Sequence, residues 1–453
     1  MRELKSRLHA LIGALSAGLV ERDTAIRLAL LAALAAEHLL LIGPPGTAKS
    51  ELARRLHRAF RDASYFERLL TRFSVPEELF GPLSISALEE DRYERQTAGF
   101  LPTASIAFID EVFKANSAIL NALLTLLNER EFDNGAQRVC TPIISVIGAS
   151  NEVPEDEVTA AFYDRFLLRC QLRPVSRAGF DALVRLPFTD ALDVPGALRL
   201  GHDEPAAIAA KLDRVALPEE ILAWLEALRA FLAEQDIYVS DRRWRKIVRL
   251  LKTSALTNGR DAVDIWDLWL LRFCAAHKPE QAALVAEWYE RRLGVFEKLD
   301  PERFARVVEA FEAQLELEGK ASELAYGEDG RLRLGENVGD AKGASLATRM
   351  TYMGTKRYGA THIAARMAQA RMLIDELDEY LRRLAAMRET LQRAVGEHLW
   401  IDREFGPHAD ASLARTGEAV EKLRSRMALV LEGFASLPRL PADSGVVPEP
   451  IAP

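Results

Sequence analysis

One eight-residue turn constrains the fold of this chain more than any other feature of its sequence. An apolar run over residues 38–42 stops at the turn, and helical spacing of apolar residues resumes after it, over residues 50–56. The turn reads Gly43-Pro44-Pro45-Gly46-Thr47-Ala48-Lys49-Ser50. A glycine-rich turn between a strand and a helix aims backbone N–H groups and the helix N-terminus at one point, which suits phosphate oxygens. The pattern therefore predicts a phosphate-binding loop.

The positions of this loop have different expected roles. We expect the loop backbone to cradle the phosphates, Lys49 to reach the β- and γ-phosphates, and Ser50 to bind Mg²⁺. Ala48 stands where the standard pattern has glycine, and the loop can close if this alanine has an ordinary φ. The alternative interpretation is a chance glycine-proline turn before a helix.

Polar residues follow two further apolar runs. Asp110 and Glu111 come directly after the run 106–109, and Asn151 comes shortly after the run 143–149. Parallel strands would deliver these side chains to one edge of a sheet, beside the loop. We expect Asp110 to hold Mg²⁺ through water, Glu111 to act as general base on the attacking water, and Asn151 to orient that water. The alternatives are a strand end at the surface and an ordinary turn.

Arginines supply the positive charge that such a site needs. Arg165 lies within Asp164-Arg165-Phe166, at the start of the apolar run 166–172, and Arg242 with Arg243 begins a helix after Ser240-Asp241. Positive charge at the γ-phosphate stabilises the transition state of phosphoryl transfer. The alternative for each arginine is a solvated surface charge or an ion pair.

Short apolar runs alternate with helical segments in the first part of the chain. The runs at 106–109, 143–149 and 166–172 have the length and composition of buried parallel strands, and residues 116–129 have helical spacing. Residues 1–36 read as two amphipathic helices, with Asp23 as a plausible N-cap of the second. The predicted fold class is α/β, a parallel sheet flanked by helices.

Strand-like runs cease after about Pro174. Helical spacing, with caps or proline at the helix starts, then covers residues 218–234, 241–256, 261–277 and 280–293. These segments predict a small all-α domain behind the α/β domain.

The last third of the chain predicts long helices. Apolar residues recur at alternating spacings of four and three over residues 373–395 and 413–434. Two such helices, separated by Phe405-Gly406-Pro407, should pack as a hairpin, with a helix at 301–315 as a possible third member. The predicted boundaries are 1–190 for the N-terminal helices and α/β domain, 191–297 for the all-α domain, 298–440 for a helical arm with a polar insertion at about 319–359, and 441–453 for a disordered tail.

The composition excludes several classes of protein. Lys and Arg total 59 against 67 Asp and Glu, a formal net charge of −8, which argues against a basic nucleic-acid coat protein. Three distant cysteines and eight scattered histidines provide neither a disulfide framework nor a protein metal cluster. The cysteine usage favours a reducing cytoplasm. Arg27, Glu37 and His38 interrupt the longest apolar stretch, so we expect no membrane span.

Together these residues resemble the MoxR branch of the AAA+ ATPases, in which alanine before the lysine is usual. The segments that carry this resemblance are 43–50, 108–111, 150–151 and 164–166. Within that branch, the segments 69–84, 121–130 and 239–244 look like the RavA subfamily. The likeness covers about residues 1–293.

The resemblance implies a ring, usually a hexamer, that binds ATP with Mg²⁺ between subunits. It implies that Arg165 is the arginine finger acting in trans and that Arg242 is the lid sensor, with its subunit of action left open. It also implies inserted hairpins at about 82–102 and 131–142, where Asp133-Asn134-Gly135 is itself a hairpin-turn signal. The alternative for these hairpins is surface loops without function.

The leading hypothesis is a Mg-ATP-driven ring that remodels, assembles or activates a protein partner, for which the resemblance suggests a von Willebrand factor A (VWA) domain. RavA-like chains carry a compact β-rich insertion in their helical stalk, whereas the polar stretch 319–359 is short. One rival is a DNA-translocating or helicase-type motor, which the acidic net charge disfavours. Another rival is a nucleotide-gated scaffold.

Overall fold

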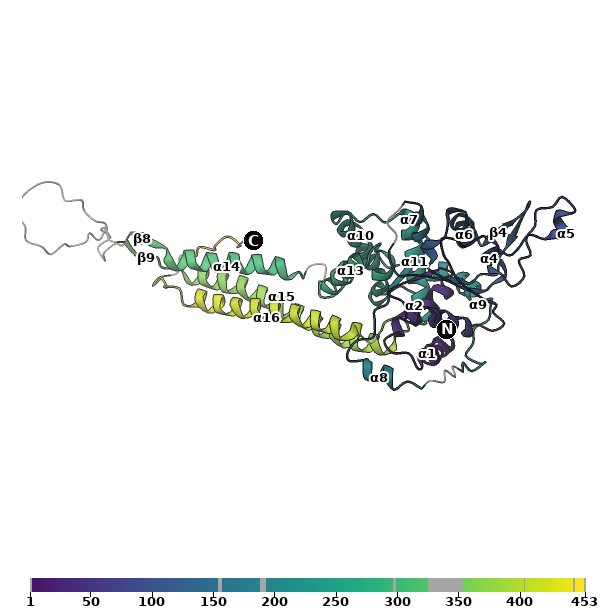
Figure 1. Cartoon of the computed structure of the whole chain (residues 1–453). Coiled ribbons are helices and arrows are strands. Elements are labelled where there is room, and N and C mark those ends of the chain that lie inside the picture. Colours follow the sequence, from purple (N-terminus) through teal and green to yellow (C-terminus); the bar gives the residue numbers. More distant parts are fainter. Residues whose placement is uncertain are drawn as a thin grey trace, which may run out of the picture. The chain divides into compact units, whose positions relative to one another are not determined.

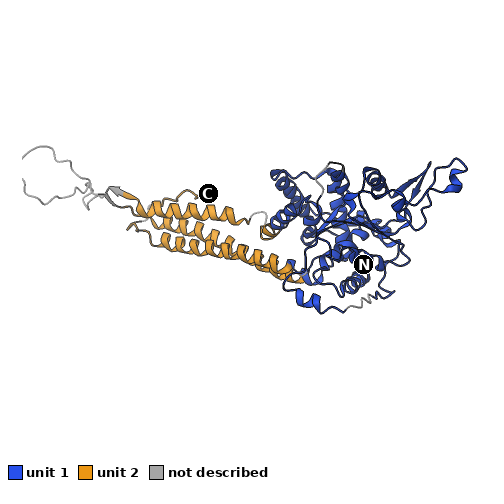
Figure 2. Cartoon of the chain, viewed as in Figure 1, with its two compact units in different colours: residues 1–289, 394–405 blue, residues 290–393, 406–453 orange. Residues whose placement is uncertain are grey.

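The computed structural model describes residues 2–153, 157–187, 193–295, 299–324, 353–402, 404–442 and 445–451. It divides into two compact units (Figure 2). Unit 1 comprises residues 1–289 and 394–405, and unit 2 comprises residues 290–393 and 406–453. Over the described residues, no helix combines the length and the apolar character that crossing a membrane requires.

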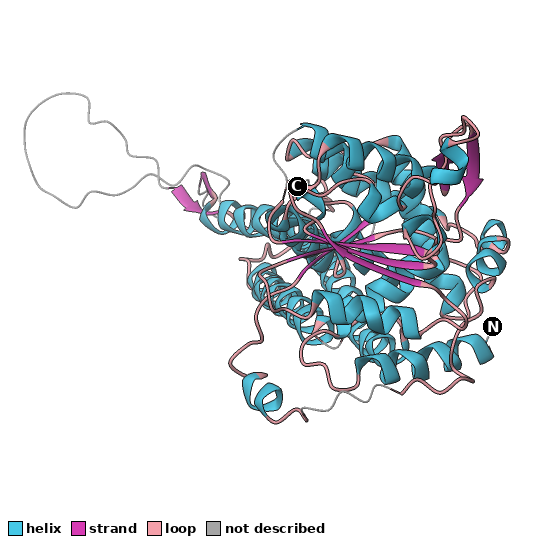
Figure 3. Cartoon of the chain, turned by 45° about the vertical axis from the view of Figure 1, so that its right-hand side comes forward, coloured by secondary structure: helices cyan, strands magenta, loops and turns pink. Residues whose placement is uncertain are grey.

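A five-stranded parallel sheet forms the centre of unit 1 (Figure 3). Its strand order is β2-β3-β6-β1-β7. The strands are β1 (Leu39–Ile42), β2 (Tyr65–Leu69), β3 (Ile106–Asp110), β6 (Ser145–Ser150) and β7 (Leu168–Gln171). This arrangement confirms the predicted α/β class. In the register, Ile42 pairs with Ser150 and Ile109 pairs with Gly148, so the carboxyl ends of β1, β3 and β6 lie together at one edge.

Strand β2 is the one strand of this sheet that the sequence analysis missed. It lies at the edge of the sheet, where only β3 pairs with it. Glu67 and Arg68 occupy its middle, and only Phe66 among its residues is buried. An edge strand with one covered face needs no continuous apolar run, so the pattern that identified the central strands does not detect it.

Helices cover both faces of the sheet (Figures 1 and 3). They are α1 (Arg2–Ser16), α2 (Asp23–Leu34), α3 (Lys49–Arg58), α6 (Ser117–Glu129) and α7 (Glu157–Tyr163). The Asn116 side chain caps α6 by accepting the Ile119 N–H at 3.0 Å. The predicted N-cap role of Asp23 is wrong, because Asp23 is the first residue of α2 and accepts a hydrogen bond from Ser16 instead.

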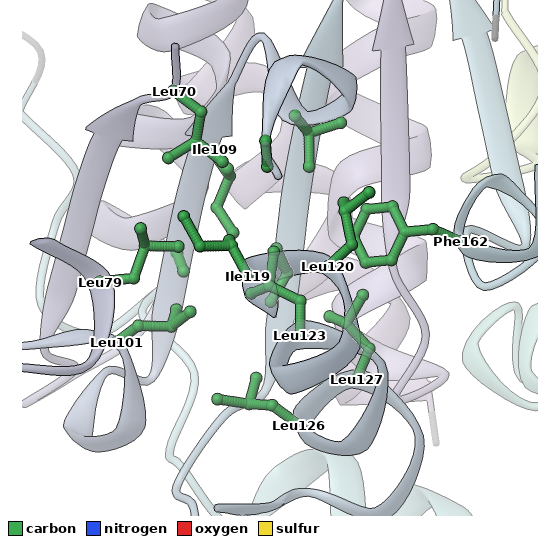
Figure 4. Close-up of a cluster of buried hydrophobic side chains, with 14 of the residues drawn as sticks. Leu70, Leu79, Leu101, Ile109, Ile119, Leu120, Leu123, Leu126, Leu127 and Phe162 are labelled. Carbon is green, nitrogen blue, oxygen red and sulfur yellow. The ribbon is translucent and has the colours of Figure 1, made fainter. Parts of the chain in front are cut away.

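The packing of α6 against the sheet fixes the end of β3. Ile119, Leu123 and Leu126 are completely buried in a cluster that includes Ile109 of β3 and Phe162 of α7 (Figure 4). Each buried leucine or isoleucine contributes roughly 1.5–3 kcal/mol relative to an exposed one. The residue after Ile109 is Asp110, so this core holds the first of the two predicted acidic residues in place.

Two insertions carry short elements of their own. The first contains α4 (Glu77–Phe80), α5 (Ile85–Leu88) and an antiparallel bridge between Leu83 and Arg95. The second is a hairpin of β4 (Glu131–Asn134) and β5 (Gln137–Cys140). Gly135 in its turn has φ +66°, a conformation that favours glycine. Short 3₁₀ helices occur at η1 (Leu101–Thr103) and η2 (Val112–Lys114).

The rest of unit 1 is helical, as predicted. It contains α8 (Phe180–Val184), α9 (Glu204–Ala209), η3 (Leu212–Arg214), α10 (Glu219–Glu234), α11 (Asp241–Thr257) and α13 (Pro279–Arg292). The single helix predicted over 261–277 is wrong, because this segment forms the 3₁₀ helix η4 (Ile265–Leu270) and the short α12 (Leu271–Cys274). A capping box between Asp264 and Asp267 starts η4, and the 3₁₀ turn buries Trp266 and Trp269, three residues apart, on one face.

Unit 2 consists mainly of three long helices: α14 (Pro301–Lys320), α15 (Ala360–Glu397) and α16 (Phe405–Ala435). Arg426 of α16 pairs with Glu312 of α14 in a two-bond ion pair of 2.8 and 2.6 Å. A Cβ on Gly433 of α16 would lie 2.4 Å from the Leu315 side chain of α14, so the two helices approach closely at this position. The helix beginning at Pro301 is therefore the third member of the bundle.

Two predictions about the ends of these helices need correction. Phe405-Gly406-Pro407 does not separate the long helices but forms the first turn of α16, where proline is tolerated. Strands β8 (Ser322–Leu324) and β9 (Met353–Thr355) pair inside the stretch 319–359, for which only a polar insertion was predicted; residues 325–352 lie outside the described residues. In the expected tail, the Glu449 carbonyl accepts a hydrogen bond from Arg366.

Candidate active site

The loop after β1 has the geometry of an anion cradle. Gly43 is required at its start, because a Cβ there would lie 2.3 Å from the Leu172 carbonyl oxygen. Among the described residues, the backbone N–H groups of Gly46 through Ser50 donate to no protein acceptor. These donors surround the N-terminus of α3, whose dipole favours a negative charge. The loop backbone therefore fits a phosphate group.

Ala48 departs from its expected conformation. Its φ is +66° and its ψ is +28°, so the alanine adopts the left-handed conformation rather than an ordinary φ. That conformation costs an L-residue roughly 1–2 kcal/mol. The loop closes in the shape that a glycine would give it, and the alanine bears the strain.

Lys49 links the loop to the neighbouring strand β6. Its Nζ donates to the Gly43 carbonyl oxygen at 2.6 Å and to Asn151 Oδ1 at 2.8 Å. Burial lowers the pKa of this ammonium, while the charges of Asp110 and Glu111 act in the opposite direction. A phosphate on the loop would supply a further negative charge and favour the protonated lysine.

The two predicted acidic residues lie at the same edge. Asp110 is the last residue of β3, and its Oδ1 accepts the Glu111 N–H at 2.9 Å. Glu111 has φ +51°, and its carboxylate accepts a hydrogen bond from the Asn151 amide and pairs with Lys114 at 3.2 Å. Strained backbone at such a position is typical of active sites. Asn151 thus connects Lys49 with Glu111.

Two residues of this site were missed by the sequence analysis. Arg22 is buried, and it donates to the Thr47 carbonyl oxygen at 3.0 Å and to the Arg173 carbonyl oxygen at 2.8 Å. It thereby ties the start of α2 to the phosphate loop. Lys114 pairs with the Glu111 carboxylate from three positions downstream. Arg22 and Lys114 belong to no recognisable sequence motif. Only their positions in the fold show that they lie at this site.

The available metal donors suit Mg²⁺ better than a metal held by protein alone. Within the described residues there is no cluster of three or more His, Cys, Asp or Glu side chains that could hold a metal ion. Mg²⁺ uses one or two protein oxygens together with water and substrate phosphates. Ser50, in the first turn of α3, and Asp110 are oxygen donors of this kind.

The two predicted arginines, Arg165 and Arg242, lie close to each other. None of their described contacts is with the phosphate-binding loop. Arg165 is half-buried, and its Nε has no hydrogen-bond partner among the described residues. Burial lowers its pKa, and the nearby positive charge of Arg242 lowers it further. Arg242 is exposed and donates to Asn128 Oδ1 of α6 at 2.7 Å. The structure therefore groups Lys49, Asp110, Glu111 and Asn151, and it groups Arg165 with Arg242 separately.

Family models match two segments of the chain. Residues 6–190 match the MoxR domain found in MoxR-vWA-beta-propeller ternary systems. Residues 220–289 match an AAA lid domain. The first match covers the sheet and the loop, and the second covers α10 to α13.

Several known proteins are similar to this chain. Two uncharacterised proteins of Methanocaldococcus jannaschii are 43% and 42% identical over 273 and 269 residues, which is 60% and 58% of this chain and 70% and 69% of theirs. A structural protein of Acidianus two-tailed virus is 29% identical over 37% of this chain and 28% of its own length. The solved structure of a candidate ATPase from Cytophaga hutchinsonii has the same fold, with a TM-score of 0.51 and 17% identity over 63% of this chain and 94% of that one.

Proposed function

Since the chain belongs to the MoxR family of AAA ATPases, we propose that it binds ATP with Mg²⁺ on the loop after β1 and hydrolyses it. The connected side chains Lys49, Asn151 and Glu111 are the observation that carries this proposal. They form one hydrogen-bonded series of an ammonium, an amide and a carboxylate at the carboxyl edge of the sheet, which supports this proposal.

Each group of this series has a distinct task in the proposed reaction. The loop N–H groups and Lys49 hold the β- and γ-phosphates. Ser50 and Asp110 would hold Mg²⁺, which would supply positive charge to offset that of the phosphates. Asn151 orients a water molecule, and Glu111 accepts its proton while the new bond from water oxygen to γ-phosphorus replaces the bond to ADP.

Replacing Glu111 with glutamine tests this assignment. Glu111→Gln keeps the shape and the hydrogen bond from Asn151 but removes the proton acceptor, so turnover should fall about 100-fold or more. Binding of ATP should change by no more than a few fold, because Glu111 does not touch the loop. Turnover measured by phosphate release and affinity measured by calorimetry give both values. Full turnover in this variant would contradict the role of Glu111, and Glu220→Gln, an exposed change in α10, is the control.

We also propose that the protein works as a ring, a hexamer by family resemblance, in which Arg165 and Arg242 act on the neighbouring subunit's ATP. The two arginines lie close together, and no described contact of either reaches the loop of their own chain. The Arg165 Nε has no hydrogen-bond acceptor within the described residues, so this donor is unsatisfied in the single chain. This arrangement favours action in trans for both side chains.

The proposed client is a protein that contains a VWA domain, which the ring remodels, assembles or activates. The MoxR model that matches residues 6–190 comes from systems that include a vWA component. The finer similarity to RavA rests on three sequence segments and stays a prediction. Proteins retained by the Glu111→Gln variant in ATP would identify the client. Retention of DNA, or ATPase activity stimulated by DNA with steep salt dependence, would instead support a DNA motor.

A further inference from the structure

Arg243 differs sharply from Arg242, its neighbour in the first turn of α11. Arg242 is exposed, whereas the Arg243 side chain is 2% exposed. A buried guanidinium has lost its hydration and must be bonded by protein groups. The partners of Arg243 therefore show what this side chain holds in place.

The partners of Arg243 lie on both sides of the proposed arginine finger. The guanidinium donates to the Asp164 carboxylate at 3.1 Å and to the Leu167 carbonyl oxygen at 2.8 Å. It also donates to the carbonyl oxygens of Asp164 and Phe166 at 3.2 to 3.4 Å. The residue between Asp164 and Phe166 is Arg165. Arg243 thus forms hydrogen bonds to residues on both sides of Arg165, in the short turn that carries this residue.

The same guanidinium also connects this turn to the all-α part of unit 1. Its Nε donates to the Cys274 carbonyl oxygen at 2.6 Å, at the end of α12. Arg243 itself belongs to α11. One side chain therefore connects two lid helices to the turn between α7 and β7. A displacement of α11 would be transmitted to that turn through these hydrogen bonds.

Among the described residues, no hydrogen bond of the Arg165 side chain fixes its position. Its Nε lacks an acceptor among the described residues, and the bond that fixes its backbone runs from its N–H to the Phe162 carbonyl oxygen at 3.0 Å. Arg169 gives the turn a second support, because it donates to the Tyr163 carbonyl oxygen and lies 3.7 Å from the Asp164 carboxylate. The direction of Arg165 is therefore set by residues around it.

We propose that Arg243 is a positioning residue for Arg165, so that the lid of one subunit controls whether its finger reaches the ATP of the next subunit. This inference rests on the proposed function, because it needs Arg165 to act in trans. It predicts that damage to Arg243 impairs the neighbour's active site and leaves the active site on its own chain competent. If Arg243 had a purely structural role, its substitution would instead impair the active site on its own chain.

Mixed assemblies distinguish these two cases. Arg243→Lys keeps the positive charge but cannot bridge the turn and α12 as a planar guanidinium does. We expect turnover to fall roughly 10- to 100-fold with little change in KM for ATP, because a displacement of about 1 Å suffices for such a loss. Mixing this variant with Glu111→Gln should raise turnover above the sum of the turnovers of the two variants measured alone. In the mixed assembly, the Arg243→Lys chain supplies Glu111 and the Glu111→Gln chain supplies a correctly positioned Arg165.

Two reference experiments make the result decisive. Arg165→Ala mixed with Glu111→Gln should also regain turnover, and Arg245→Lys, an exposed change in the same helix, should leave turnover unchanged. Recovery with Arg165→Ala but not with Arg243→Lys would overturn the positioning role alone. No recovery in either mixture would overturn the action of Arg165 in trans, and with it this inference.

A second variant covers the case in which Arg243→Lys does not fold. Asp164→Asn removes the charge that Arg243 binds but keeps the size of the side chain, and Asp164 is only partly buried. We expect a smaller loss of turnover that the same mixture with Glu111→Gln restores. Unchanged turnover in Asp164→Asn, or a loss that the mixture does not restore, would contradict the proposal.

Discussion

At the residue scale, buried polar side chains connect the strands that carry the site. His38, directly before β1, donates from Nε2 to the Leu127 carbonyl oxygen at 3.0 Å, and its Nδ1 accepts the Val146 N–H at 3.1 Å. One ring nitrogen donates and the other accepts, so the imidazole is neutral. Burial, with a smaller contribution from the nearby Arg130 and Lys246 charges, lowers the pKa of His38 to about 3.

This histidine predicts a definite pH dependence of stability. Between its ordinary pKa of about 6.5 and its folded value of about 3, the unfolded chain binds a proton that the folded chain does not. The contribution of His38 is therefore complete above about pH 6.5 and is lost as the pH falls, by up to about 1.4 kcal/mol per pH unit. Urea unfolding from pH 7 to pH 5 should show this slope.

His38→Gln should reduce that slope and should lower stability at pH 7, where the two hydrogen bonds of the ring are intact. His9→Gln, an exposed change on α1, should leave the slope as it is. An unchanged slope in His38→Gln would show that other groups dominate the acid sensitivity of the protein.

The site residues differ in how well sequence patterns identify them. Lys49, Asp110, Glu111 and Asn151 follow apolar runs, and parallel strands bring such positions to one edge. Arg22 and Lys114 could not be found in this way, because their roles depend on contacts with the Thr47 carbonyl and the Glu111 carboxylate. The conformation of Ala48 was predicted wrongly, because the shape of the loop prevails over the preference of the residue.

At the element scale, long periodic segments were predictable and short irregular ones were not. The central strands and the helices α6, α10 and α11 were predicted to within about two residues. The 3₁₀ helix η4 was not, because Asp264 and Asp267 cap it locally and Asp267 is also bonded to Arg260 and His398. His398 lies more than 100 residues downstream, so no local pattern contains this information.

Residues 398–402, which follow α15, belong to unit 1. Leu399, Trp400 and Ile401 are almost completely buried. Trp400 Nε1 donates to Thr257 Oγ1 of α11 at 2.9 Å, and the Leu399 N–H donates to Asn258 Oδ1 at 2.9 Å. On the other side, Thr24 and Arg27 of α2 donate to Asp402 and to the Leu399 carbonyl oxygen. This segment joins the all-α part to the helix that follows Arg22.

Substitutions of Trp400 separate the hydrogen bond from the packing. Trp400→Phe removes the bond to Thr257 but keeps most of the ring, so we expect a loss of about 1 kcal/mol. Trp400→Ala also leaves a cavity, so we expect a loss of about 3–5 kcal/mol. Chemical unfolding monitored by circular dichroism measures both. Equal effects of the two substitutions would show that packing around the indole contributes little.

At the scale of the whole molecule, the chain order and the compact units do not coincide. The predicted boundaries divide the chain into consecutive segments, whereas unit 1 also takes in residues 394–405 after more than 100 residues of unit 2. Phe405 illustrates the reason, because its ring stacks on Tyr289 at 5.8 Å and contacts Trp269 at 6.1 Å between ring centroids. Aromatic surface of the lid is covered by residues that are distant in the sequence.

A chain that ends at residue 293 should therefore be an incomplete folding unit. It keeps the phosphate loop, Glu111 and both proposed arginines, but it lacks the buried side chains of Leu399, Trp400, Ile401 and Phe405. Each of them contributes roughly 1.5–3 kcal/mol of burial, an amount comparable in sum to the stability of a typical domain. We expect the truncated chain to melt well below the full-length protein and to expose apolar surface to a hydrophobic dye.

A peptide of residues 394–405 should reverse part of this loss when it is added to the truncated chain. A ligand that binds only the folded state raises stability by RT ln(1 + [L]/Kd), about 2.7 kcal/mol at a concentration of 100 times Kd. The same peptide with Trp400→Ala should not rescue, because it lacks the indole that fills the site beside Thr257. A truncated chain as stable as the full-length protein would show that unit 1 folds without this segment. It would also show that the long helices of unit 2 contribute nothing to the stability of unit 1.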